Sequence, residues 1–209
     1  MKLYTMPGTC ALACNIAVAW SDAPIEIVNL EYGAHKSEEY RALNPRMQVP
    51  ALVFDDGSVL TEATAILAFI GAKFGGNEEY ARDEPLGYRE AEALSFLSSE
   101  VHAAFKGHFS PGTFADSPKT EKVVRHKTYD RLRPMFARLD EQVGGTDGPW
   151  LLERKSYAEG YLYICCRWLE RTPIDLNDYP NLVKHQIAME EDEGVLLALG
   201  RQGMRVAKR

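Results

Sequence analysis

The feature that most constrains the fold is a proline-flanked turn leading directly into a strand. Residues 44–50 read Asn-Pro-Arg-Met-Gln-Val-Pro, and residues 51–54 (Ala-Leu-Val-Phe) are apolar, as in a buried strand. Neither Pro45 nor Pro50 has an N–H to donate to a sheet, and the following proline holds Val49 extended. We expect the Val49 backbone to be free at a sheet edge, where an extended peptide can pair with it. The alternative is an ordinary trans-proline at a strand entry, since most X–Pro bonds are trans.

Strands and helices alternate around this turn. The patterns predict strands at 2–5, 25–30, 51–54 and 58–60, and helices at about 9–21, 37–42 and 61–74. The order βαβαββα requires a parallel strand pair with a right-handed crossover. The Asp55-Asp56-Gly57 turn makes the last pair antiparallel. We therefore expect residues 1–75 to form an α/β domain with a mixed four-stranded sheet.

Beyond residue 75 the patterns are helical only. Residues 76–83 are polar and glycine-containing, which predicts a linker, and residues 84–209 form the expected all-α domain. A small polar stripe (Glu92, Ser95, Ser99, His102) lines either a cleft or an ordinary solvated face. Pro134 is expected to kink or restart its helix. Ser156 and Glu159 have the spacing of a capping box.

Charge and composition exclude several classes of partner. The 209 residues carry a net charge of -6, which argues against nucleic acid. No stretch approaches the roughly 20 apolar residues of a membrane span, and no signal-peptide pattern is found at the beginning. We expect a cytoplasmic protein without membrane partners, with its four cysteines reduced. The spacing of the cysteines and histidines matches no metal-site pattern, so no metal is expected.

Cys10 is the best candidate for chemistry. It follows the Pro7-Gly8 turn at the first turn of a predicted helix, capped by Gly8 or Thr9. Free N–H groups and the helix dipole favour an anion there, so the pKa of the thiol is expected to be lowered. The same place could hold the thiolate of a ligand, with Cys10 as its partner. A small buried hydrophobic residue is the competing interpretation.

Glu62 lies where a strand meets the third predicted helix. An acidic residue there stabilises the helix, but it could also bind the ammonium group of a ligand. The N–H groups of Ala63 and Thr64 could bind a carboxylate. A thiolate site, a free extended backbone and a paired ammonium and carboxylate site together suit the tripeptide γ-Glu-Cys-Gly, which is glutathione.

The whole chain resembles the glutathione transferases, and among them the bacterial beta class. The resemblance is carried by residues 1–4 with 7–10, 44–52, 60–63, 99–102 and the helix from 156 to 168. It implies a thioredoxin-like N-terminal domain, an all-helical C-terminal domain, a homodimer and a role in detoxification, with glutathione as co-substrate. It also implies a cis Val49–Pro50 bond, with the Val49 backbone pairing the cysteinyl part of glutathione.

The resemblance further implies roles for individual residues. Glu62 and Ala63 would hold the γ-glutamyl end. Cys10 would approach the sulfur, with Thr9 able to share the activating role, and His102 would line the same cleft. Ser99 and Glu100 would reach the ligand from the same or the neighbouring subunit, and Lys36 could reach the glycyl carboxylate. Two departures are Thr5, where the family often has tyrosine, and Ala103, where lysine commonly follows the cleft histidine.

The resulting hypothesis is an enzyme that directs the glutathione thiolate at an electrophilic carbon, or exchanges through a mixed disulfide with Cys10. Residues 103–118 contain Phe105, Phe109 and Phe114 and suggest a small apolar electrophile, although Phe105 could equally belong to the core. Conjugation, disulfide reduction and dehalogenation are not distinguished. The alternative is a regulatory interaction protein on the same scaffold.

Overall fold

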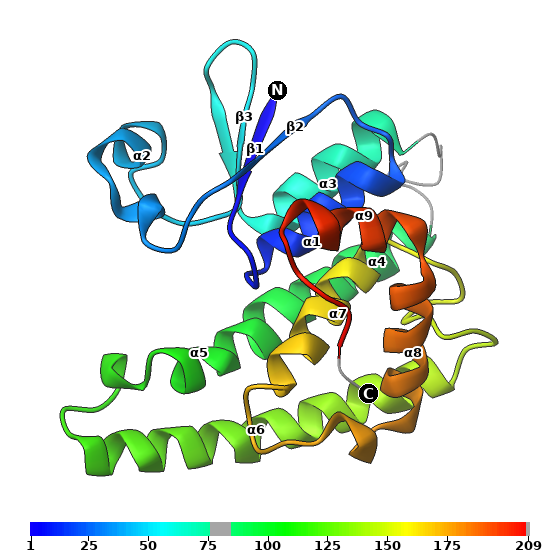
Figure 1. Cartoon of the computed structure of the whole chain (residues 1–209). Coiled ribbons are helices and arrows are strands. Elements are labelled where there is room, and N and C mark those ends of the chain that lie inside the picture. Colours follow the sequence, from blue (N-terminus) through cyan, green and yellow to red (C-terminus); the bar gives the residue numbers. More distant parts are fainter. Residues whose placement is uncertain (76–84, 208–209) are drawn as a thin grey trace.

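The computed structural model describes residues 1–75 and 85–207, in which an α/β part packs against a helical part (Figure 1). The predicted linker at 76–83 lies outside the described residues. The N-terminal elements are β1 (Lys2–Thr5), α1 (Ala11–Trp20), β2 (Glu26–Asn29), η1 (Ala34–Lys36), α2 (Glu38–Leu43), β3 (Ala51–Val53), β4 (Val59–Thr61) and α3 (Ala63–Phe74). This is the predicted βαβαββα order, with an additional short 3-10 helix.

The sheet has the strand order β2-β1-β3-β4. β1 and β2 are parallel, with Leu3 opposite Ile27, whereas β1 and β3 are antiparallel, with Leu3 opposite Leu52. β4 pairs antiparallel with β3, as the turn at 55–57 predicts. Leu3 and Leu52 are fully buried because α1 and α3 cover the sheet. The mixed four-stranded sheet of a thioredoxin-like domain is confirmed.

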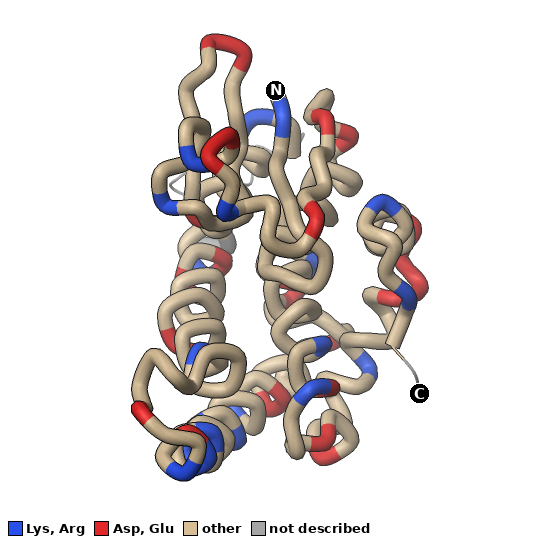
Figure 2. The backbone as a smooth tube through the Cα atoms, turned by 60° about the vertical axis from the view of Figure 1, so that its left-hand side comes forward, with Lys and Arg blue, Asp and Glu red and all other residues tan. Residues whose placement is uncertain are grey.

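The regular elements of the C-terminal part, within the region described, are all helices. Its elements are α4 (Pro85–Phe96), η3 (the π-helical turn Leu97–His102), α5 (Ala103–Phe109), η4 (Pro111–Thr113), α6 (Pro118–Gly144), α7 (Ala158–Leu169), η5 (Leu176–Asp178), α8 (Pro180–Glu191) and α9 (Glu193–Arg201). Lysine and arginine positions gather on the first half of α6, and acidic positions are spread over both parts (Figure 2). No helix among residues 1–75 and 85–207 has the length and apolar character needed to cross a bilayer.

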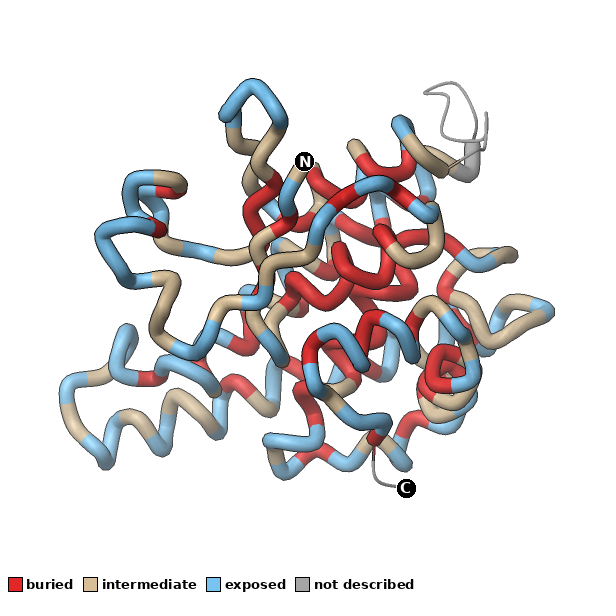
Figure 3. Tube along the Cα trace, turned by 45° about the horizontal axis from the view of Figure 1, so that its top comes forward, coloured by how far each residue is buried: buried red, intermediate tan, exposed pale blue. Residues whose placement is uncertain are grey.

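Buried segments gather in the middle of the molecule (Figure 3), and α1 packs against both α7 and α9 of the helical part. Gly160 allows α7 to approach α1 closely, since a Cβ at this position would lie 3.3 Å from the Ala13 Cα. The indole of Trp168 donates to the Gly8 carbonyl at 2.9 Å, and Trp20 donates to Asp192 at 2.7 Å. These contacts fix the helical part at both ends of α1, at Gly8 in the turn before it and at its last residue, Trp20.

Two local expectations, for the caps of α1 and α7, are corrected by the structure, and the expectation for Pro134 is decided only in its second half. Helix α1 begins at Ala11 with Cys10 as its N-cap residue; the preceding Thr9 hydroxyl donates to the Met6 carbonyl at 2.7 Å and accepts a long hydrogen bond from the Ala11 N–H at 3.4 Å. Helix α6 runs through Pro134 without restarting. The Ser156 hydroxyl contacts Glu159 at 3.2 Å, but α7 begins at Ala158, so the capping box does not form.

Candidate functional site

A cleft of about 840 Å3 lies between the α/β part and the helical part. The N-terminal side is formed by residues 6–10, Tyr32 and His35, the turn around the cis-proline, and residues 61–63. The helical side contributes Ser98, His102, Ala103, Lys106, Phe109, Ser110, Tyr161, Trp168 and Arg171. The cleft therefore brings Cys10, Val49 and Glu62 together at one surface, as the sequence analysis expects.

Cys10 borders this cleft but is 8% exposed. Its Sγ contacts the Val49 carbonyl oxygen at 3.9 Å, a long contact for a thiol donor. Burial raises the pKa of Cys10 to about 12, outweighing a backbone hydrogen bond that lowers it. The expected lowering of this pKa is wrong, because desolvation of the thiolate exceeds the effect of the helix start. At neutral pH Cys10 is a thiol and can donate a hydrogen bond.

The turn before β3 presents the Val49 backbone to the cleft. The Val49–Pro50 peptide bond is cis, as the family resemblance implies. The turn is held from one side, because the Tyr40 hydroxyl and the Asn44 amide both donate to the Gln48 carbonyl, at 2.7 and 2.9 Å. Within the described ranges no group bonds to the Val49 N–H. An extended peptide can therefore pair with it.

Glu62 occupies the N-cap position of α3 with φ 69, an uncommon conformation for a residue with a side chain. This backbone turns the carboxylate into the cleft mouth, where it forms an ion pair with Arg46 at 2.8 Å. The N–H groups of Ala63 and Thr64 belong to the first turn of α3 and have no partner within the helix. A carboxylate and free helix N–H groups are thus adjacent, which suits an amino acid head group.

His102 lies in the cleft wall opposite the sheet. Its Nδ1 is 2.8 Å from the hydroxyl of Tyr161, and its ring packs 4.8 Å from that of Trp168. Burial lowers the pKa of His102, so the imidazole is neutral at neutral pH. The Tyr161 hydroxyl also acts on Cys10, where it lowers the pKa of the thiol. The Tyr161 hydroxyl therefore connects the imidazole to the thiol.

Tyr161 and Trp168 are site residues that the sequence analysis did not single out. They are nearly buried, which agrees with their helical spacing, but each also borders the cleft. The polar atom of each side chain was the available signal, because a buried hydroxyl or indole N–H needs a partner. The periodicity alone does not distinguish a core position from one at the edge of a cleft.

Not every residue proposed from the sequence borders the cleft. Thr9, Pro50 and Ala63 do so, whereas Lys36 does not and its neighbour His35 does. Ser98 borders the cleft, whereas Ser99, which was expected there, does not. The Ser99 hydroxyl instead donates to the Ser95 carbonyl at 2.8 Å. Glu100 forms an ion pair with Arg131 at 2.6 Å. The roles of Lys36, Ser99 and Glu100 therefore stay predictions.

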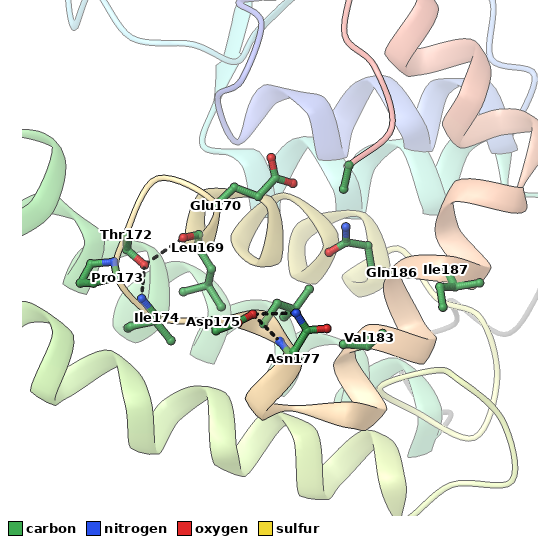
Figure 4. Close-up of a pocket in the computed structure, with 12 residues that line it drawn as sticks. Leu169, Glu170, Thr172, Pro173, Ile174, Asp175, Asn177, Val183, Gln186 and Ile187 are labelled. Atoms are coloured by element: carbon green, nitrogen blue, oxygen red, sulfur yellow. Dashed lines mark hydrogen bonds between the residues drawn. The ribbon is translucent and has the colours of Figure 1, made fainter. Parts of the chain in front are cut away.

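A second cavity, of about 520 Å3, lies between the end of α7, the following loop and α8 (Figure 4). Side chains such as Thr172, Asp175 and Asn177 bond to their own loop there. None of the residues around this cavity was singled out from the sequence, so the cleft beside Cys10 is the candidate site. Across the part of the chain described, no three His, Cys, Asp or Glu side chains are grouped to hold a metal ion.

A thioredoxin-like sheet, a cis-proline turn and a helical partner domain around one cleft define the glutathione transferase class of fold. The N-terminal domain model of the glutathione S-transferases matches residues 1–72. Glutathione S-transferase GST-4.5 of Xanthomonas campestris is 30% identical, over 98% of this chain and 100% of its own length. GstA of Escherichia coli O157:H7 is 28% identical over 98% of this chain and 100% of its own. This chain belongs to the glutathione S-transferase family.

Solved structures agree with this assignment. The glutathione S-transferase from Xylella fastidiosa matches with a TM-score of 0.88 and 31% identity, covering 98% of this chain and 99% of its own. A sphingomonad glutathione S-transferase complexed with glutathione matches with a TM-score of 0.86 and 31% identity, covering 98% of this chain and 100% of its own. A bacterial beta class enzyme of Sphingomonas chungbukensis gives 0.84 and 30%, covering 98% and 100%. The likeness to the bacterial beta class agrees with the sequence resemblance.

Proposed function

We propose that this protein is a glutathione transferase that binds glutathione in the cleft beside Cys10 and directs its thiolate at an electrophilic carbon. The observation that carries the proposal is the convergence of Cys10, Val49 and Glu62 on one surface. The names of the full-length relatives favour an enzyme over a regulatory scaffold. A scaffold would have no need for these three groups in one cleft.

In the proposed complex the tripeptide lies along the free edge at Val49. The γ-glutamyl ammonium meets the Glu62 carboxylate, and its carboxylate meets the first N–H groups of α3. The cysteinyl N–H and C=O pair with the Val49 backbone. The glycyl end then extends toward residues 32–36, where Lys36 is proposed to reach its carboxylate. This orientation brings the sulfur to the start of α1.

We assign Cys10 the role of a hydrogen-bond donor to the glutathione thiolate. A group with a pKa of about 12 keeps its proton at neutral pH, so it can donate but is a poor nucleophile. The raised pKa favours conjugation over exchange through a Cys10 mixed disulfide. The Thr9 hydroxyl bonds the Met6 carbonyl and is less available to the ligand. His102 is proposed to line the electrophile side.

Binding to immobilised glutathione and conjugation of 1-chloro-2,4-dinitrobenzene test this proposal. We expect both in the wild-type protein, with elution by free glutathione. Failure to bind glutathione at millimolar concentration would refute the enzyme hypothesis and favour the scaffold. Cys10→Ser keeps a donor and should keep most of the conjugation rate, whereas Cys10→Ala removes the donor and should raise the pKa of bound glutathione. Loss of conjugation in Cys10→Ser, with glutathione binding intact, would indicate a covalent role for the thiol.

We further propose a division of labour between residues 1–75, which bind glutathione, and residues 84–209, which carry the electrophile site and the dimer contacts. A homodimer would bring Ser99 and Glu100 near the site of the partner subunit. Light scattering of the purified protein tests the oligomeric state, and a monomeric mass would exclude a role of Ser99 and Glu100 in the partner subunit's site.

A cytoplasmic location and a role in electrophile detoxification are proposed from the resemblance to the family, and cell fractionation tests the location.

A further inference from the structure

The helical side of the cleft carries two exposed cations. Lys106 of α5 and Arg171, just beyond α7, both border the cleft and are exposed. Within residues 1–75 and 85–207 neither has a carboxylate within ion-pair distance, whereas the other strong cation of the cleft, Arg46, is paired with Glu62. A pair of uncompensated cations at the mouth of a cleft attracts an anionic ligand.

Aromatic rings hold both cations in place. The Lys106 Nζ lies 5.6 Å from the centre of the Phe114 ring, and the Arg171 guanidinium lies 5.3 Å from that of Phe109. Phe109 in turn packs against Trp168, with ring centres 5.6 Å apart. Contacts of this kind position a cation without neutralising it, because the ring contributes a quadrupole and no net charge. The positive charge therefore remains available to a ligand.

The same wall is apolar next to the cations. Phe109 and Trp168 line the cleft, whereas Phe105 is fully buried behind them and belongs to the core. His102 is neutral, because burial lowers its pKa. Among the residues that the structure describes, Glu62 is the only strong anion bordering the cleft, and the proposed function assigns it to the ammonium of glutathione. A flat aromatic group with a negative substituent complements this surface.

We propose that the preferred electrophile of this enzyme is an aromatic compound carrying a carboxylate, bound by Arg171 and Lys106. This inference rests on the proposed function and narrows the apolar electrophile expected from the sequence. The ring would lie against Phe109 and Trp168, with the carboxylate at the two cations and the reacting carbon toward the sulfur of glutathione. For a chloroarene, a C–S bond forms and the C–Cl bond breaks. Chloride leaves with the bonding pair, and the thiol proton of glutathione passes to solvent.

The test compares 4-chloro-3,5-dinitrobenzoate with its uncharged methyl ester. The ratio of kcat/KM for the two compounds is measured in the wild type and in Arg171→Gln and Lys106→Gln, so that their different intrinsic reactivities cancel. We expect each variant to lower the ratio about fivefold, the size of one exposed charge pair of about 1 kcal/mol. The charge reversal Arg171→Glu should lower it further. The matched control Lys127→Gln removes an exposed cation of α6 outside the cleft and should leave the ratio unchanged.

The possible results of this test separate the further inference from the proposed function. If the wild type conjugates the ester but the ratio is the same in all variants, the inference is wrong and the proposed function stands. If Arg171→Gln and Lys106→Gln instead raise the KM for glutathione equally with both compounds, the cations bind the glycyl carboxylate, and the inference is again wrong. If neither compound is conjugated although 1-chloro-2,4-dinitrobenzene is, the inference is wrong and the proposed function stands. If none of the three is conjugated although the protein is folded, both the inference and the proposed function fail. A wild-type ratio that falls toward that of Arg171→Gln as salt rises supports the inference.

Discussion

Replacing Glu62 by glutamine should separate binding from folding. The Glu62 carboxylate forms one ion pair with Arg46 at 2.8 Å, and the two side chains are 61% and 62% exposed. An exposed pair of this kind contributes about 0–1 kcal/mol to stability. A charged hydrogen bond to a ligand is worth about 1.5–3 kcal/mol. We therefore expect Glu62→Gln to weaken glutathione binding about 10- to 150-fold, with a fall in Tm below about 4 °C.

The chain offers a matched control in Glu26. Glu26 is also 61% exposed and lies in the same domain, where it pairs with Lys2 at 3.3 Å, but it does not border the cleft. Glu26→Gln should match Glu62→Gln in thermal stability and the wild type in glutathione affinity. Isothermal titration calorimetry measures the affinity, and circular dichroism measures the Tm. Equal affinities in the two variants would refute the assignment of Glu62 to the ligand ammonium.

Three further predictions concern burial. Because burial raises the pKa of Cys10 to about 12, the rate of its alkylation by iodoacetamide should increase about tenfold per pH unit from pH 7 to 10. Peptide mass spectrometry measures this rate. A rate that reaches a plateau below pH 8 would contradict the raised pKa. Glu159→Ala removes the acceptor of the buried Leu151 N–H and should lower the free energy of unfolding, measured by urea denaturation, by about 2–5 kcal/mol. The control Glu153→Ala changes an exposed residue and should lower it by less than about 0.5 kcal/mol. Similar costs for the two would disprove the role of this acceptor. Gly107→Ala directs a Cβ at the Thr128 hydroxyl and should lower the free energy of unfolding by about 1–3 kcal/mol. Adding Thr128→Ala should restore part of this loss. A stabilised single variant would show that α5 and α6 can move apart to make room for the Cβ.

The raised pKa of Cys10 shows where local rules stop. Its position at the start of α1 follows from the Pro7-Gly8 turn, and the helix-terminus argument alone predicts a lowered pKa. Desolvation of this thiol depends on packing against segments far away in the sequence, because Cys10 belongs to a buried cluster that includes residues of α7. Tyr161 and Trp168 were missed for the same reason, because they are far from Cys10 in the sequence. The spacing of apolar residues tells that a side chain is covered, but it does not tell which surface covers it.

The sequence by itself determined the element order, the mixed sheet, the change to helices beyond residue 75 and the gathering of Cys10, Val49 and Glu62 at strand and helix ends. These follow from periodicity and from proline and glycine positions, which act within a few residues. Tertiary structure alone decided that Cys10 is a protonated thiol, that His102 is a neutral imidazole contacting Tyr161, and that Lys106 and Arg171 both border the cleft. Burial and the pairing of charges depend on segments that come together only when the α/β and helical parts pack.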